Sequence, residues 1–134
     1  MANHFNELKI ASLNFSLGSG GFKDACDNLN DVDAMALSSM INTLRNFGVA
    51  TVIASGNDGE TAKISFPACI STAISVGATD KSDKVASFSN SSALLDLLAP
   101  GVNITSAYPG FQYATWSGTS MAAPHVAGAF AILK

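Results

Sequence analysis

The sequence predicts an α/β fold with a mostly parallel sheet. Short apolar runs typical of strands alternate along the chain with longer segments of helical periodicity, which is the pattern of this class. The runs at residues 49–55 and 73–78 are apolar almost throughout, as expected of strands that are covered on both faces. Composition agrees, because 48% of the 134 residues are hydrophobic and only 13% are charged.

The first half of the chain is expected to hold a strand, a helix and a second strand. Residues 9–16 form the first strand, which ends at the glycine-rich segment 18–21. Residues 30–46 form the helix, with apolar residues near one face at Val32, Met35, Ala36, Met40, Leu44 and Phe47. Asn30 or Asp31 would cap its start and Gly48 would end it. The strand at 49–55 follows.

The second half adds two strands, a hairpin and a helix. Residues 73–78 read as a buried strand and residues 94–97 as a short one. Residues 104–107 and 112–116 flank Pro109 and Gly110, which suit the second and third places of a turn and so predict a hairpin. A helix of small residues is expected at 121–133, with Pro124 near its first turn.

One serine stands at the start of this last helix, in the segment WSGTSMAAPHVAG at residues 116–128. Gly118 permits a tight turn, and a helix start offers free N–H groups and a partial positive charge. An oxyanion next to Ser120 would therefore be stabilised. From the residues Gly-Thr-Ser alone, an ordinary helix-capping serine is the simpler interpretation.

The whole segment resembles the nucleophile motif of the subtilisin-like serine proteases. Six shorter segments resemble other motifs of this family and follow in the family's order: SLG at 16–18, IASGNDG at 53–59, FPA at 66–68, VGA at 76–78, ASFS at 86–89 and LAPGV at 98–102. Each is weak alone, but together in register they are specific. The resemblance implies that residues 1–134 form a single partial catalytic domain, a three-layer fold whose N-terminal strands are missing.

The family pattern also includes an Asp and a His, and this sequence lacks both motifs. The family places them well before the SLG strand, whereas only 15 residues precede Ser16 here. Of the two histidines, His4 matches no catalytic motif. His125 follows Ser120 by five residues, about 140° around the helix and roughly 7.5 Å along it, so it should point away. The resemblance thus implies the serine-bearing half of an endopeptidase, inactive as an isolated chain.

Asn57 is the second chemical candidate. The resemblance implies that its carboxamide and the Ser120 backbone N–H form an oxyanion hole. On sequence alone, Asn57 in the segment Asn-Asp-Gly is also an ordinary turn residue.

The same resemblance assigns a substrate-binding strand and a specificity pocket. The strand is Ser16, Leu17 and Gly18, although 18–21 also reads as a plain flexible loop. The other pocket wall is Ala54, Ser55 and Gly56, with Ser65 near the base. These small residues predict a roomy, uncharged pocket that favours large apolar side chains.

The resemblance further suggests a weak calcium site, although no cofactor is required. It would consist of Asp96 with the carbonyls of Ala68 and Ile70, while a solvated or capping aspartate is an equal alternative. It also places Cys26 near Cys69, so that a disulfide is expected, with two free buried thiols as the alternative. Phe66-Pro67 is a candidate cis peptide.

Charge and hydropathy limit the partners. A net charge of −3 argues against nucleic-acid binding, and no run approaches the ~20 apolar residues of a membrane span. The expected partners are a peptide or protein substrate, and either the missing N-terminal half or a second copy that covers exposed apolar surface. We expect the complete protein to be secreted. A non-catalytic, peptide-binding or structural remnant of a protease is the alternative function.

Overall fold

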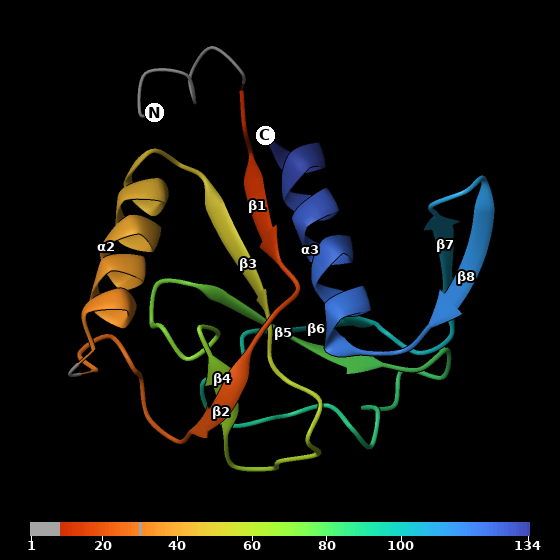
Figure 1. Cartoon of the computed structure of the whole chain (residues 1–134), viewed down its shortest axis with the longest axis horizontal. Coiled ribbons are helices and arrows are strands. Elements are labelled where there is room, and N and C mark those ends of the chain that lie inside the picture. Colours follow the sequence, from red (N-terminus) through yellow and green to blue (C-terminus); the bar gives the residue numbers. More distant parts are fainter. Residues whose placement is uncertain (1–8, 30) are drawn as a thin grey trace.

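A four-stranded parallel sheet forms the centre of the computed structural model, which describes residues 9–29 and 31–134. The strand order is β1-β3-β5-β6. The bounds are β1 Ser12–Phe15, β3 Ala50–Ala54, β5 Ile74–Thr79 and β6 Leu97–Pro100. Helix α2 (Val32–Asn46) and helix α3 (Thr119–Leu133) lie on either side of the sheet (Figure 1). The predicted α/β class with a parallel sheet is therefore confirmed.

Two small antiparallel sheets flank this centre. Strand β2 (Ser19–Phe22) pairs with β4 (Ile64–Phe66), and β7 (Ile104–Tyr108) pairs with β8 (Gln112–Trp116). The second pair is the predicted hairpin, and it projects beyond α3, away from the rest of the molecule (Figure 1). The first pair was not predicted, because residues 18–21 carry no strand pattern.

The core lies on both faces of the sheet because side chains alternate along each strand. On β3, Ile53 belongs to a cluster with Ile41 of α2, and its neighbours Val52 and Ala54 belong to a cluster with α3. The α3 side consists mainly of small residues: Ala54, Ala78, Ala99, Ala122 and Ala123. These small side chains let the helix backbone approach the sheet closely.

Several predicted boundaries were wrong. Helix α2 begins at Val32 and not at residue 30, but the predicted cap Asp31 is confirmed, since its carboxylate accepts from the backbone N–H groups of Asp33 and Ala34. Asn30, the other candidate cap, lies outside the described residues. The strand expected at 94–97 is β6 at Leu97–Pro100, because Ser75 bonds to both Leu94 and Asp96 and holds them in the preceding turn.

The last helix begins two residues earlier than expected, at Thr119. Pro124 is therefore its sixth residue and lies inside the helix rather than in its first turn. A proline there removes one helical hydrogen bond.

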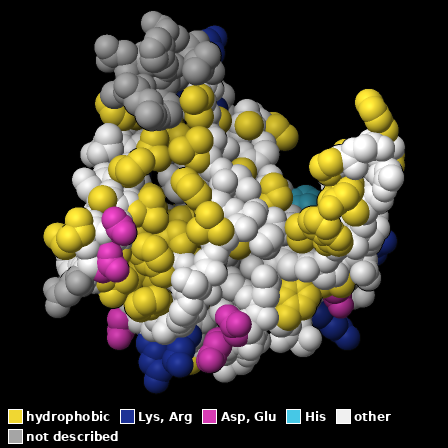
Figure 2. Space-filling model, viewed as in Figure 1, with side chains coloured by type: hydrophobic (Ala, Val, Ile, Leu, Met, Phe, Trp, Pro, Cys, Tyr) yellow, Lys and Arg dark blue, Asp and Glu magenta, His cyan; other side chains and the backbone are white. Residues whose placement is uncertain are grey.

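Much apolar surface is uncovered. Large side chains that stay exposed include Val32 and Met35 on α2, Ile132 and Leu133 at the end of α3, and Phe111 and Tyr113 on the hairpin. Figure 2 shows such side chains gathered on the hairpin and on the face between α2 and α3. In the described part of the chain, β1 is hydrogen-bonded on one side only, to β3. The expected exposed apolar surface is therefore present, together with an open strand edge at β1.

Candidate active site

Ser120 is the second residue of α3 and is half-buried. Gly118 is the N-cap residue, and no side chain caps the helix. Ser120 is therefore not a capping serine. Its own backbone N–H donates to no acceptor within residues 9–29 and 31–134. This helix start thus offers a free donor and the positive end of the helix dipole next to a hydroxyl group.

The end of β1 is joined to this helix start. Ser16 Oγ donates to the Ser120 carbonyl oxygen at 2.8 Å, and Ser120 Oγ lies 3.4 Å from the Ser16 carbonyl oxygen. The contacts bring together two segments separated by 104 residues in the chain. They place the predicted substrate-binding strand directly beside the candidate nucleophile.

Asn57 lies against the same helix start. Its Oδ1 accepts from the Thr119 backbone N–H at 2.8 Å and from Thr119 Oγ1 at 3.0 Å. A Cβ added to Gly118 would lie 3.6 Å from that Oδ1 and 3.7 Å from Nδ2, so the carboxamide packs directly on the turn. In the described part of the chain Nδ2 has no acceptor, which leaves it available for a ligand oxygen. A simple turn role does not account for this arrangement.

A cavity of about 390 Å³ opens beside these groups. Its lining contains six of the seven residues predicted to bind substrate, together with both catalytic candidates: Ser16, Leu17, Gly18, Ala54, Gly56, Ser65, Asn57 and Ser120. The seventh, Ser55, is fully buried behind the wall, where its Oγ donates to the Asn90 carbonyl at 2.9 Å. The volume is within the range of small-ligand sites.

The predicted absence of charge from this cavity was wrong. Asp58, which follows Asn57, also lines it. One oxygen of this carboxylate accepts from Asn90 Nδ2 at 3.2 Å. No cationic residue is among the lining residues, so the pocket carries a single negative charge.

No base serves Ser120 in the described part of the chain. His125 Nδ1 donates to the Met121 carbonyl at 2.8 Å, one turn back along its own helix. His125 and Ser120 line a common cavity of about 380 Å³ between β7 and α3, but no hydrogen bond joins them. His125 thus bonds within its own helix, and its lack of a catalytic role stays a prediction. His4 lies outside the described residues.

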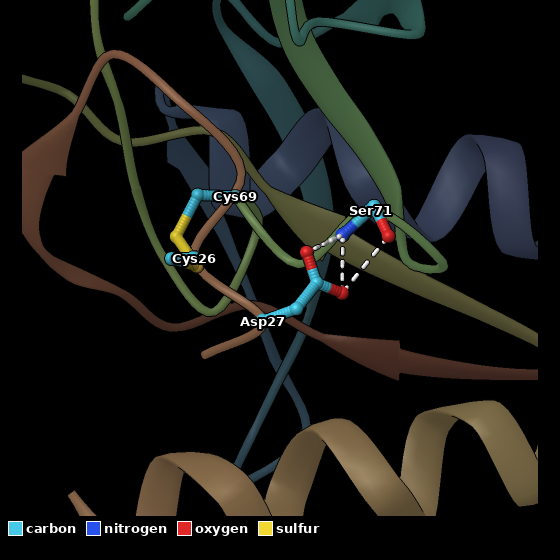
Figure 3. The surroundings of a disulfide bond; sticks show 4 residues. All are labelled: Cys26, Asp27, Cys69 and Ser71. Atoms are coloured by element: carbon cyan, nitrogen blue, oxygen red, sulfur yellow. Dashed lines mark hydrogen bonds between the residues drawn. A yellow bond between two sulfur atoms is a disulfide. The ribbon is translucent and has the colours of Figure 1, made fainter. Parts of the chain in front are cut away.

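A disulfide joins Cys26 to Cys69, with a Cα–Cα distance of 5.4 Å (Figure 3). This bridge was the expected pairing. Cys69 lies in the turn after β4, and its N–H donates to the Ser65 carbonyl at 3.1 Å. Beside it, the Asp27 carboxylate accepts from the backbone N–H and hydroxyl of Ser71. Bridge and carboxylate together tie the loop before α2 to the segment that follows β4, the strand that carries Ser65. The Phe66-Pro67 peptide is cis, as expected.

The candidate calcium ligands make a poor donor set. One oxygen of Asp96 accepts from the Ser75 N–H and hydroxyl, both at 2.8 Å. Ala68 and Ile70 are buried and do not line the cavity that Asp96 lines. Within residues 9–29 and 31–134 there is no group of three or more His, Cys, Asp or Glu residues suited to a metal. Asp96 thus bonds to Ser75 of β5 and caps neither α2 nor α3, and calcium binding stays a prediction.

Comparison with known proteins places the chain in a family. Residues 6–134 match the model of the subtilase family of peptidases. Subtilisin BL from Lederbergia lenta is 52% identical over 98 residues, which cover 73% of this chain and 36% of that protein. Subtilisin-like protease 2 from Pseudogymnoascus destructans is 44% identical over 132 residues, which cover 96% of this chain and 33% of that protein.

Solved structures agree with the sequence comparison. A cold-adapted subtilisin-like serine proteinase superposes with a TM-score of 0.74 at 39% identity, covering 91% of this chain and 41% of that one. The Prenylagaramide maturation protease PagA gives a TM-score of 0.77 at 29% identity, covering 94% of this chain and 44% of that one.

The chain belongs to the subtilase family, a family of serine endopeptidases. It spans about a third of the length of the curated relatives that it matches. Its partial subtilisin-like fold is the one that the sequence motifs predicted. Asp58 and Asn90 are the site residues that sequence reasoning missed.

Proposed function

We propose that this chain is the serine-bearing part of a subtilisin-like endopeptidase, with Ser120 as its nucleophile. The observation that carries the proposal is the position of Ser120: its hydroxyl lies beside the free N–H of a helix start, the unused amide donor of Asn57 and a cavity of about 390 Å³. Apart from the base, these are the parts that acyl transfer through a serine requires.

The chemistry follows from this arrangement. Ser120 Oγ attacks the carbonyl carbon of a peptide that lies along residues 16–18. The carbonyl oxygen becomes an oxyanion, which Asn57 Nδ2 and the Ser120 N–H stabilise. The hydroxyl proton must pass to a base, which returns it to the leaving amine as the oxyanion collapses and the peptide C–N bond breaks. This leaves an ester between Ser120 Oγ and the acyl half of the peptide. The same base must then activate the water that hydrolyses this ester and restores the hydroxyl. We propose that a His and an Asp outside this chain supply these steps.

The partner that brings this base is expected to bind next to Ser120 on the hairpin side. There, Ile104, Ser106, Met121 and Pro124 line the cavity between β7 and α3 that ends at Ser120. The open edge of β1 is continuous with the site through Ser16. We propose that the missing N-terminal half of the catalytic domain covers both surfaces.

A complementation experiment tests this proposal. The chain is combined with the part of Subtilisin BL that precedes its matching region, and complex formation is checked by sedimentation. Hydrolysis of a chromogenic peptide is then measured, with Ser120→Ala as the control. We expect turnover in the complex that is lost in the control. A stable complex without serine-dependent turnover would contradict the proposed function.

A non-catalytic, peptide-binding remnant is the second candidate. The absence of any base beside Ser120 in the described part of the chain favours it. Such a protein would bind peptides in the same cavity, and Ser120→Ala would leave that binding unchanged. Serine-dependent turnover in the complemented complex would support the endopeptidase, and peptide binding without turnover would support the non-catalytic remnant.

We further propose that the complete protein acts outside the cell on peptide or protein substrates. Two observations support this. The chain is 44% identical over 102 residues to the minor extracellular protease Epr of Bacillus subtilis, and it carries a buried disulfide. No helix within the described ranges 9–29 and 31–134 has the length and apolar character needed to cross a membrane.

A further inference from the structure

Asn90 is a fully buried polar residue that lies behind the candidate oxyanion hole. It belongs to the long loop between β5 and β6, far from Asn57 and Ser120 in sequence. Its side chain has two acceptor sites and two donor hydrogens, and every one of them is used. The partners all belong to residues 58–65, which run from the loop after β3 into β4.

Asn90 holds the loop that carries Asn57 at three points. Its Oδ1 accepts from the backbone N–H groups of Asp58 at 2.9 Å and Glu60 at 3.1 Å. Its own backbone N–H donates to the Gly56 carbonyl at 3.0 Å. The bonds bracket Asn57 on both sides without touching it. They leave the carboxamide of Asn57 free to bond to Thr119.

The other end of the Asn90 carboxamide faces the specificity pocket. Nδ2 donates to Asp58 Oδ2 at 3.2 Å and lies 3.5 Å from Ser65 Oγ. Asp58 and Ser65 both line the pocket. One buried side chain thus contacts the oxyanion loop and two residues of the pocket wall.

Gly56 shows how closely these parts fit. Its φ of +111° suits glycine, and an added Cβ would collide with Asn90 Nδ2 and Ser65 Oγ. On its other side, the Gly56 N–H donates to Thr119 Oγ1 at 3.3 Å. Gly56 is therefore held between Asn90 and Thr119, the residue that also bonds to Asn57.

We infer that Asn90 is a positioning residue, which holds the loop at residues 56–60 so that Asn57 presents its amide donor beside Ser120. The inference rests on the proposed function for its catalytic meaning. No hydrogen bond joins Asn90 to Ser120 in the described part of the chain, so Asn90 acts through Asn57 and not on the reacting atoms. The same contacts fix the carboxylate of Asp58 at the pocket wall.

Hydrogen exchange followed by mass spectrometry tests the positioning without requiring activity or a monomeric sample. In Asn90→Ala, the amides of residues 56–60 should exchange at least about tenfold faster, since each lost bond is worth on the order of a factor of ten. Protection in β3 and β5 should stay within about twofold of the native chain. Asn42→Ala, at an exposed position of α2, is the control and should change neither region.

A reciprocal substitution keeps the test decisive if Asn90→Ala loosens the whole fold. Asn90→Asp places two carboxylates face to face, whereas Asn90→Asp combined with Asp58→Asn restores one donor and one acceptor. We expect fast exchange at residues 56–60 in the single variant and at least partial recovery in the double variant. Equal loss of protection in β3, β5 and the loop, without recovery, would show a general packing role and overturn the inference.

The catalytic consequence is measured in the complemented enzyme. Asn90→Ala should lower kcat with little change in KM, and should have almost no further effect in an Asn57→Ala background, because both act through one donor. Additive losses would overturn the inference. Local loss of protection in a complex that never turns over substrate would support the positioning role and contradict the proposed function, so the two failures are distinguishable.

Discussion

The hydroxyl of Ser16 takes the place of a missing helical donor for the carbonyl of Ser120. In a regular helix that carbonyl would accept from the N–H four residues later. That residue is Pro124, which has no N–H, and Ser16 Oγ donates instead at 2.8 Å. The proline inside α3 thus ties the candidate nucleophile to the end of β1.

This relationship predicts a coupling between Ser16 and Pro124. Ser16→Ala should lower the free energy of unfolding by about 1 kcal/mol, because a carbonyl loses its partner. In a Pro124→Ala background the new N–H satisfies the same carbonyl, so Ser16→Ala should then cost clearly less. Urea unfolding of the four chains of this double-mutant cycle measures the difference.

Ser12→Ala is the matched control for that cycle. Ser12 Oγ also donates from β1 to a carbonyl of α3, that of Ala127, at 2.8 Å. The residue four positions after Ala127 is Ala131, which has an N–H. The loss of stability caused by Ser12→Ala should therefore be the same in the native chain and in the Pro124→Ala background. Equal coupling for both serines would contradict the explanation.

A second prediction concerns activity of the isolated chain. The described residues place no base near Ser120, so its hydroxyl should stay protonated and weakly nucleophilic. Loss of the histidine alone is known to lower kcat about 10⁶-fold in a subtilisin, and we borrow that magnitude from this relative. Hydrolysis of a chromogenic peptide should equal that of Ser120→Ala. Turnover that vanishes in Ser120→Ala would reveal a base that the described residues do not show.

What the sequence could predict depended on how far apart the interacting residues lie. Ser120, Asn57 and residues 16–18 belong to contiguous motifs, and the structure brings them together. Asn90 carries no local signal, because its partners are up to 35 residues away. The strand expected at 94–97 failed for a similar reason. Leucines stand on both sides of Asp96, so the sequence pattern does not show at which residue the strand begins. The hydrogen bonds from Ser75 to Leu94 and Asp96 determine where β6 begins.

The disulfide should contribute much of the stability. It closes a loop with a sequence separation of 43 residues, for which the chain-entropy estimate is about 4 kcal/mol. Reduction should therefore lower the free energy of urea unfolding by roughly 2–4 kcal/mol. The variant with both Cys26→Ser and Cys69→Ser should have the same free energy of unfolding as the reduced chain. Adding reductant should not change that value. Equal stability of the oxidised and reduced chains would contradict this prediction.

Asp58 should influence which side chain the pocket accepts. Its carboxylate is the single charge in the lining, so a lysine or arginine next to the scissile bond should be favoured over a neutral side chain of similar length. Because Asp58 is exposed, the gain in kcat/KM is expected to be only about three- to tenfold and to shrink with salt. The ratio of kcat/KM is measured with the complemented enzyme on two peptides that differ only in the side chain next to the scissile bond. Asp58→Asn should remove the preference, and a preference that persists would place its origin elsewhere.

The last prediction is that the isolated chain associates with itself. The open edge of β1 presents unpaired backbone groups, and Ile132 and Leu133 at the end of α3 are 87% and 82% exposed. Covering apolar surface of this kind contributes about 25 cal/mol for each Å². Sedimentation should therefore show dimers or larger species.

Charged substitutions locate the surface that drives this association. Ile132→Lys combined with Leu133→Lys should shift the distribution toward monomer, because a second copy would have to bury two ammonium groups. Val85→Lys is the control: Val85 is 51% exposed on the loop after β5, and the substitution there should change little. A monodisperse native monomer at the same protein concentration would overturn the prediction. It would also favour an independent, non-catalytic domain, since such a chain needs no partner to cover its core.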